Sequence, residues 1–248
     1  MIKKKSRRIG QLNCTVVQSD DLDIPPHAAV ILCHGFGASG EDLVSLANEF
    51  IAGDSRLAQA IFVFPTAPLE LDPMYESRAW WMIDIERLQQ LMEVGETRDM
   101  RHTSPPDLPA CRQMIFQIID ALKSEYSLAS NQIVVGGFSQ GAMLSTDVAL
   151  HYPELLGGLI IWSGGLICES DWVAAARRHS PMKIVQTHGR IDPILSIAGA
   201  EDLRQLLLEA KHDVRYAAFQ GPHTIPMIGL QIAAQLVVEV VERDNNTA

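Results

Sequence analysis

Ser139 is the residue in this sequence best placed to act as a nucleophile. It lies at the centre of a Gly-x-Ser-x-Gly pattern, Gly137-Phe138-Ser139-Gln140-Gly141. An apolar run before the pattern predicts a buried strand, and the residues after it have helical spacing. At a sharp strand-to-helix turn, flanking glycines allow backbone contacts that a Cβ would block. The pattern is typical of a nucleophile elbow, and the alternative is a glycine-rich loop with an incidental serine.

Asp192 and His223 each follow a later apolar run, 182–187 and 214–219. A serine hydroxyl is a poor nucleophile unless a histidine takes its proton and a carboxylate orients that histidine. The chain order Ser, Asp, His is that of the triad in α/β-hydrolases. Either residue alone could be an ordinary turn residue. Because both lie at the carboxyl ends of predicted strands, we expect them to form a triad with Ser139.

An acyl-transfer site also needs two N–H groups that stabilise the oxyanion of the tetrahedral intermediate. The residue after the nucleophile, Gln140, is expected to supply one backbone donor. The glycine-rich turn at residues 34–37 follows another apolar run, and Phe36 in that turn is expected to supply the second. The turn is not a phosphate loop, because it lacks G-x-G-x-x-G and no Walker lysine follows it.

The elements that must position these residues alternate along the chain. Helical patterns of apolar residues separate short apolar runs, so we expect an α/β fold with a mostly parallel, doubly wound sheet and helices on both faces. A looser run at 9–18 predicts an opening strand at an edge. The runs 28–33, 60–64, 157–162 and 182–187 predict buried strands, and 132–137 and 214–219 predict the strand before Ser139 and the last strand.

The composition indicates an ordinary globular protein. The chain has 248 residues, is 47% hydrophobic and carries a net charge of −10, which argues against nucleic acid as a partner. This length suits a single domain over residues 9–248. The first eight residues hold five cations, and we expect a disordered basic tail there, although contact with a lipid surface or polyanion is the alternative.

The chain shows no sign of export or of a membrane span. No 7–15-residue apolar region follows the first cations, and no apolar run approaches 18 residues. Its four cysteines are far apart and have no metal-ligand spacing, which favours reduced thiols. We therefore expect a cytoplasmic protein that uses neither a metal nor an organic cofactor. The oligomeric state stays open, a dimer included.

The sequence resembles the small phospholipase/carboxylesterase family of α/β-hydrolases, which includes the acyl-protein thioesterases. The resemblance implies a triad of Ser139, Asp192 and His223, with Phe36 and Gln140 as the oxyanion donors. It is carried along nearly the whole chain by CHGFGASGEDL (33–43), FPTAP (64–68), WWMID (80–84), NQIVVGGFSQGA (131–142), SGG (163–165), HGRIDPIL (188–195) and GPHTI (221–225).

Three departures from the family's pattern concern the substrate. Arg190 stands where many members have a small or acidic residue, Thr66 replaces a frequent histidine, and residues 85–106 match poorly. The resemblance implies hydrolysis of carboxylic esters or thioesters through an acyl-enzyme. Lysophospholipid hydrolysis, acyl-protein thioesterase activity and peptidase activity are the alternatives, as is a non-catalytic binding protein of the same fold.

Residues 66–109 are expected to form a loop or lid-like insertion near the active site. The segment contains five prolines, and segments this long between core elements are often functional. Its apolar side chains are expected to line a groove for a lipid-like acyl chain, and the alternative is a satellite core under a long loop. The residues expected to contact the substrate are Trp80, Trp81, Leu88 and Met92.

Overall fold

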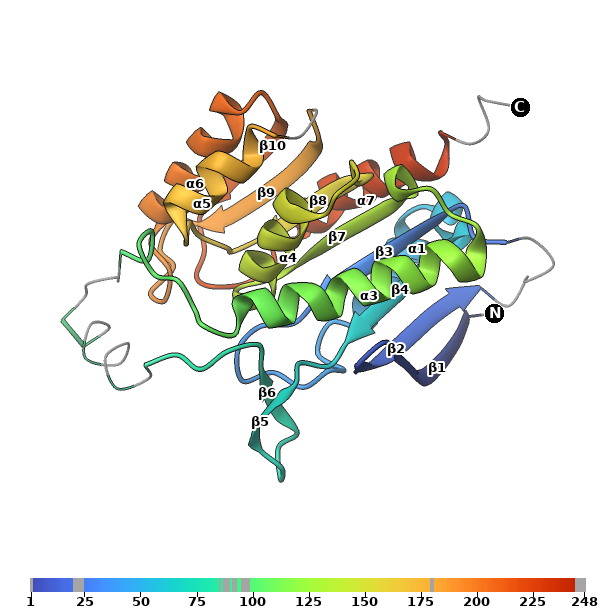
Figure 1. Cartoon of the computed structure of the whole chain (residues 1–248), viewed down its shortest axis with the longest axis horizontal. Coiled ribbons are helices and arrows are strands. Elements are labelled where there is room, and N and C mark those ends of the chain that lie inside the picture. The colour runs from blue at the N-terminus through green and yellow to red at the C-terminus, as the bar shows by residue number, and fades with distance from the viewer. Residues whose placement is uncertain are drawn as a thin grey trace.

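An eight-stranded sheet forms the centre of the molecule (Figure 1). The structure is a computed structural model that describes residues 2–19, 25–84, 86, 90, 93–94, 99–178 and 181–243. The strand order is β1-β2-β4-β3-β7-β8-β9-β10, and all neighbours from β4 to β10 are parallel. The strands are β1 Ile2–Ile9, β2 Leu12–Ser19, β3 Ala28–Cys33, β4 Ala60–Pro65, β7 Ile133–Phe138, β8 Gly158–Trp162, β9 Lys183–Gly189 and β10 Asp213–Phe219.

The order of the strands reverses between β3 and β7. After β3 the chain adds β4 on one side, and from β7 onward it adds strands on the other side. Ligands of open α/β sheets bind at such a switch point, outside the carboxyl ends of the strands. The loop after β3 and the turn after β7 both lie there, and these two segments contain the predicted oxyanion donors and Ser139.

Helices cover both faces of the sheet, as the alternating pattern predicts (Figure 1). One buried cluster joins one face to α3, α4, α5 and α6, and a second joins the other face to α1 and α7. The short helix α5 was not predicted from the sequence. The helices are α1 Ser45–Gly53, α3 Leu108–Tyr126, α4 Gln140–His151, α5 Glu169–Ala176, α6 Ile197–Glu209 and α7 Met227–Val241, with 3₁₀ turns η1 Ser55–Gln59 and η2 Ser130–Gln132. No helix among the described residues combines the length and apolar content that a membrane span needs.

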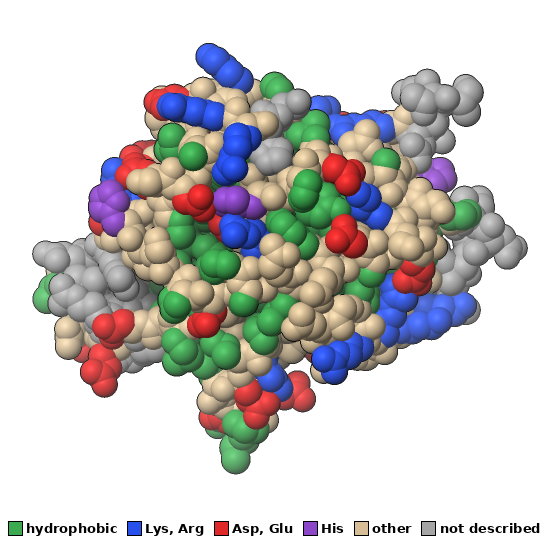
Figure 2. Space-filling view, viewed as in Figure 1, with side chains coloured by type: hydrophobic (Ala, Val, Ile, Leu, Met, Phe, Trp, Pro, Cys, Tyr) green, Lys and Arg blue, Asp and Glu red, His purple; other side chains and the backbone are tan. Residues whose placement is uncertain are grey.

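The prediction of a disordered basic tail over residues 1–8 is wrong for its described part. Ile2–Ile9 forms β1, which pairs antiparallel with β2, and Gly10 takes a positive φ of 57° in the turn between them. Lys4 pairs with Glu41, and Arg7 Nη1 lies 2.7 Å from Glu125 Oε1. Lysines on an edge strand also discourage pairing with another chain, so the cations suit a strand here. The strand predicted at 9–18 is therefore second from the edge, and Figure 2 shows cations gathered where β1 lies.

The segment between β4 and α3 contains a two-stranded hairpin of β5 (Leu69–Asp72) and β6 (Ser77–Ala79). The hairpin projects from the body of the molecule (Figure 1), and Met74 and Tyr75 in its turn are 82% and 75% exposed. The chain after β6 then enters the core at Trp80 and Trp81. Residues 83–92, where the sequence has a short helical spacing of apolar residues, fall mostly outside the described part of the chain.

Candidate active site

Ser139 occupies a strained turn between β7 and α4. Its φ of 56° and ψ of −118° are unusual for a residue with a side chain, and such conformations cost about 1–3 kcal/mol unless the surroundings hold them. Its N–H donates to Trp162 O on the neighbouring β8 at 2.9 Å. A Cβ added to Gly137 or Gly141 would lie 2.3 or 2.0 Å from Cys33 O. Only glycine at both positions therefore lets the turn pass this close to β3, as expected for a nucleophile elbow.

Asp192 and His223 meet beyond the ends of β9 and β10. Asp192 Oδ2 lies 2.6 Å from His223 Nδ1, while Asp192 Oδ1 accepts the backbone N–H groups of Ile194 and Leu195 at 2.8 and 3.0 Å. The His223 ring contacts the ring of Phe138, with centroids 4.7 Å apart. Since Phe138 precedes Ser139, the structure brings the three predicted triad residues into one neighbourhood.

The surroundings of Asp192 favour its ionised form. Burial by itself would raise the pKa of this carboxyl, but the hydrogen bond to His223 and the two backbone amides outweigh it, so the pKa lies below its usual value. His188 is fully buried nearby, with Nε2 donating to Leu195 O at 2.9 Å, and burial lowers its pKa. His188 thereby holds the turn in which Asp192 lies.

The two predicted oxyanion donors lie beside Ser139. Gln140 is the first residue of α4, where a backbone N–H has no partner within the helix and lies at the positive end of the helix dipole. Phe36 lies between Gly35 and Gly37 in the loop after β3. This loop passes close to the elbow, because a Cβ on Gly35 would be 3.5 Å from Ser139 Cβ.

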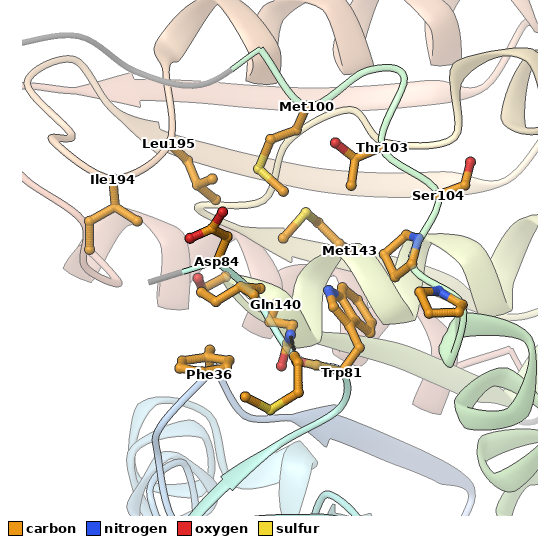
Figure 3. A pocket seen from close by; sticks show the side chains of 15 residues that line it. Phe36, Trp81, Asp84, Met100, Thr103, Ser104, Gln140, Met143, Ile194 and Leu195 are labelled. Carbon is orange, nitrogen blue, oxygen red and sulfur yellow. Dashed lines mark hydrogen bonds between the residues drawn. The ribbon is translucent and has the colours of Figure 1, made fainter. Parts of the chain in front are cut away.

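A cavity of about 230 Å³ opens beside Ser139 and Gln140 (Figure 3). In Figure 3, Phe36 and Gln140 border it on one side, with Met100 and Thr103 on another. Most lining side chains are apolar, so the cavity suits an uncharged, flexible group. The lining residues are Phe36, Trp81, Met82, Ile83, Asp84, Met100, Thr103, Ser104, Pro105, Pro106, Ser139, Gln140, Met143, Ile194 and Leu195.

Only part of the predicted substrate-binding set lines this cavity. Trp81 lines it, but Trp80 does not, because its ring is fully buried and packs against His34 with centroids 5.5 Å apart. Leu88 and Met92 lie outside the described residues. Sequence reasoning also missed lining residues from other parts of the chain. Of these, Met143 could have been found, because it lies one helical turn after Ser139.

A cluster of Asp147, His151 and Asp171 has the residue types of a metal site but is engaged by protein groups. Asp147 Oδ1 accepts Trp172 Nε1–H at 2.9 Å, and its Oδ2 lies 3.2 Å from Arg112 Nη1. His151 Nε2 is 3.1 Å from Asp171 Oδ2. A bound cation would have to displace a guanidinium from Asp147, so the cluster serves to tie α3, α4 and α5 together.

The mostly parallel sheet, the strained serine and the Asp–His pair beyond later strands define the class of the protein, which is an α/β-hydrolase. The chain belongs to the phospholipase/carboxylesterase family, whose model matches residues 12–239. It is therefore an enzyme of the carboxylesterase type, a hydrolase of esters or thioesters.

Relatives and solved structures agree with this assignment. An acyl-protein thioesterase 1 from Eremothecium gossypii is 29% identical over 191 residues, 71% of each chain. A probable carboxylesterase from Oryza sativa subsp. japonica is 28% identical over 189 residues, 75% of this chain and 72% of its own. The structure of esterase PE8 has the same fold, with a TM-score of 0.74 and 22% identity over 96% of this chain and 99% of that one. So does the Bacillus cereus carboxylesterase, with a TM-score of 0.63 and 21% identity over 92% and 94% of the two chains.

Proposed function

We propose that this enzyme cleaves acyl esters or thioesters through an acyl-enzyme, with Ser139 as nucleophile, His223 as general base and Asp192 as its orienting carboxylate. The observation that carries the proposal is the 2.6 Å contact between Asp192 and His223 next to the strained Ser139. No metal or organic cofactor takes part in the proposed reaction. The Phe36 and Gln140 amides act as the oxyanion donors.

The hydrogen bonds of Asp192 determine which His223 nitrogen acts as the base. A carboxylate only accepts hydrogen bonds, so Nδ1 carries the proton and Nε2 keeps a lone pair. Nε2 takes the Ser139 proton while Oγ attacks the acyl carbon, and the imidazolium then protonates the departing alcohol or thiol. Water attacks the acyl-enzyme in the same way, which releases the carboxylic acid and restores Ser139.

The apolar cavity favours a lipid-like acyl group as the part of the substrate bound next to Ser139. Met82 at its wall is 61% exposed, which leaves an apolar side open to solvent. The leaving group stays open: a small alcohol, a lysophospholipid or an acylated protein thiol all fit this chemistry. Acyl-protein thioesterase activity is the second candidate, because several curated relatives have that name. The acidic net charge favours such substrates over nucleic acid.

We place the reaction in the cytoplasm. All four cysteines are free, and burial raises the pKa of Cys14, Cys33 and Cys111 to about 12, so these thiols resist ionisation and oxidation. Neither the proposed chemistry nor the cavity requires a second subunit.

A fluorophosphonate probe tests the proposed nucleophile. The probe phosphonylates activated serines, so intact-mass measurement should show one adduct per chain, and peptide mapping should locate it at Ser139. The adduct should be absent from Ser139→Ala and from protein labelled after unfolding. A folded protein that gains no adduct would instead favour the non-catalytic binding protein of the same fold.

The cavity predicts a dependence on acyl-chain length. Each buried methylene contributes up to about 0.8 kcal/mol, roughly fourfold in kcat/KM, until the cavity is full. A series of p-nitrophenyl esters should therefore show kcat/KM rising beyond acetyl and then levelling off.

Two methionines provide a matched test of the cavity. Met100 and Met114 are both half-buried against the same core cluster, but only Met100 lines the cavity. Met100→Gln should shift the plateau to shorter chains, whereas Met114→Gln should leave it in place. A flat profile beyond acetyl, equal in both variants, would reject the acyl-chain site and leave a hydrolase of small esters.

A further inference from the structure

The loop that contains Phe36 is attached to β6, the second strand of the projecting hairpin, and to Trp80 just after it. We call residues 77–81 the bridging segment. Gly37 N–H donates to Arg78 O at 2.8 Å, and Arg78 N–H donates to Ala38 O at 3.0 Å. Ser77 Oγ adds a third hydrogen bond, to Gly37 O at 2.8 Å. The backbone on the carboxyl side of Phe36 is therefore held by β6.

Trp80 holds the same loop from the other side of Phe36. Its indole Nε1–H donates to His34 O at 2.9 Å. His34 Nδ1 lies 2.8 Å from Gly35 O, and its Nε2 accepts the N–H of Ala67 at 3.1 Å. Burial lowers the pKa of His34, so the ring is neutral and can make both bonds. Trp80 therefore contacts a loop residue, His34, whose ring is itself held by two further hydrogen bonds.

The Gln140 side chain connects the bridging segment to the nucleophile helix. Its Oε1 accepts Trp80 N–H at 2.9 Å and its Nε2 donates to Trp81 O at 2.8 Å, and the residue is only 2% exposed (Figure 3 shows Gln140 beside Trp81). Cys111 Sγ on α3 donates to Trp80 O at 3.0 Å. Both polar ends of the Gln140 carboxamide are thus used to hold the backbone of residues 80 and 81.

We propose that the bridging segment sets the distance between the two oxyanion donors, with Trp80 and the Gln140 side chain as positioning residues. The proposal rests on the proposed function, in which the Phe36 and Gln140 amides bind one oxygen. These amides belong to different elements, the loop after β3 and the start of α4. Residues 77–81 hydrogen-bond to both, and a misplacement of about 1 Å at such a site can cost about 10²-fold in rate.

The competing explanation is that Trp80 and Gln140 only fill the core. In that case their substitution lowers stability and leaves the chemical step unchanged in the folded enzyme. Trp172 offers a control, because it is also fully buried and its indole also makes one hydrogen bond, to Asp147, which lies about two turns after Gln140 in α4. Comparing the two tryptophans separates loss of packing from loss of oxyanion geometry.

The experiment compares Trp80→Phe, Gln140→Met and Trp172→Phe with the unmodified enzyme. Gln140→Met keeps the backbone N–H but removes both side-chain hydrogen bonds. Each variant is measured for kcat and KM on one ester and for inhibition by a trifluoromethyl ketone. Ser139 Oγ adds to the carbonyl carbon of this ketone, His223 takes the hydroxyl proton, and the former carbonyl oxygen becomes an oxyanion in the site.

We expect Trp80→Phe and Gln140→Met to lower kcat about 10- to 100-fold with little change in KM. Both variants should also lower the affinity for the trifluoromethyl ketone by a similar factor. Trp172→Phe should change the melting temperature as much as Trp80→Phe does, but it should neither lower kcat nor weaken inhibition by the ketone. Ser77→Ala, at the exposed end of the bridging segment, should lower kcat several-fold and keeps the test decisive if the buried variants do not fold. The proposal would be overturned if Trp80→Phe and Gln140→Met had the same kcat and ketone affinity as Trp172→Phe. It would also be overturned if Ser77→Ala had the kcat and ketone affinity of the wild type. The proposed function would still stand if the fluorophosphonate labels Ser139.

Discussion

Ser139→Ala is expected to lower kcat/KM by about 10⁶-fold, the size of loss seen when the nucleophile of another serine hydrolase, subtilisin, is removed. The variant keeps the binding cavity and the oxyanion donors but cannot form the acyl-enzyme. Alanine also accepts the turn no worse than serine, because the strain at φ 56° comes from the Cβ that both residues have. The protein should therefore fold normally, and the loss should appear in kcat rather than in KM.

Ser145→Ala is the matched control for this variant. Ser145 lies in the same helix, α4, and its buried hydroxyl donates to Gly136 O at 2.7 Å. Losing that bond costs about 1 kcal/mol of stability and should leave kcat/KM within a few-fold of wild type. Near-normal hydrolysis by Ser139→Ala in a preparation free of host esterases would refute the proposed nucleophile.

Asp192→Asn is expected to lower kcat/KM by about 10⁴-fold, by analogy with the same change in chymotrypsin-type triads. The hydrogen bonds of this structure give the reason. Oδ1 accepts the amides of Ile194 and Leu195, so an asparagine must keep its oxygen there and turn its NH₂ group toward His223. His223 Nδ1 then becomes an acceptor and its proton moves to Nε2, where the base needs a lone pair.

The control for Asp192→Asn is a second buried carboxylate. Asp147 is fully buried and hydrogen-bonded, but it lies in the cluster that joins α3, α4 and α5. Asp147→Asn should change the melting temperature with little effect on kcat/KM of the folded enzyme. If Asp192→Asn retained more than about a tenth of wild-type kcat/KM, the carboxylate would not be orienting the base.

Several features of this protein could be determined from local sequence. The apolar runs predict every strand from β3 to β10 except the two strands of the hairpin. Those of β3, β4, β7, β8 and β9 are buried, as in the middle of a parallel sheet, whereas β10 at the edge is only partly buried. Glycines at 137 and 141 also identify the elbow, since their close contact with β3 excludes any side chain. Asp192 and His223 follow strands whose ends must lie at one edge of the sheet, so the Asp–His contact follows from the topology.

Other features depended on contacts between residues far apart in the chain. The cation-rich sequence of β1 is typical of a solvated tail. The segment forms a strand because it pairs with β2 and because Lys4 and Arg7 find acidic partners in Glu41 and Glu125. Nothing in the local pattern distinguishes Trp80 from Trp81. The tertiary structure separates them, because the Trp80 indole reaches a carbonyl on the loop after β3 while Trp81 faces the cavity.

The shape of the cavity and the contacts of the bridging segment depend on the tertiary structure for the same physical reason. The cavity wall combines the loop after β3, α4, residues 81–84 and 100–106, and the turn that follows β9. A sequence pattern reports burial and the periodicity of one element, whereas a pocket depends on how side chains from several elements leave space between them. The sequence thus determined the type of chemistry and its reactive groups, and the packing of distant segments decided the shape of the cavity and how the oxyanion donors are held.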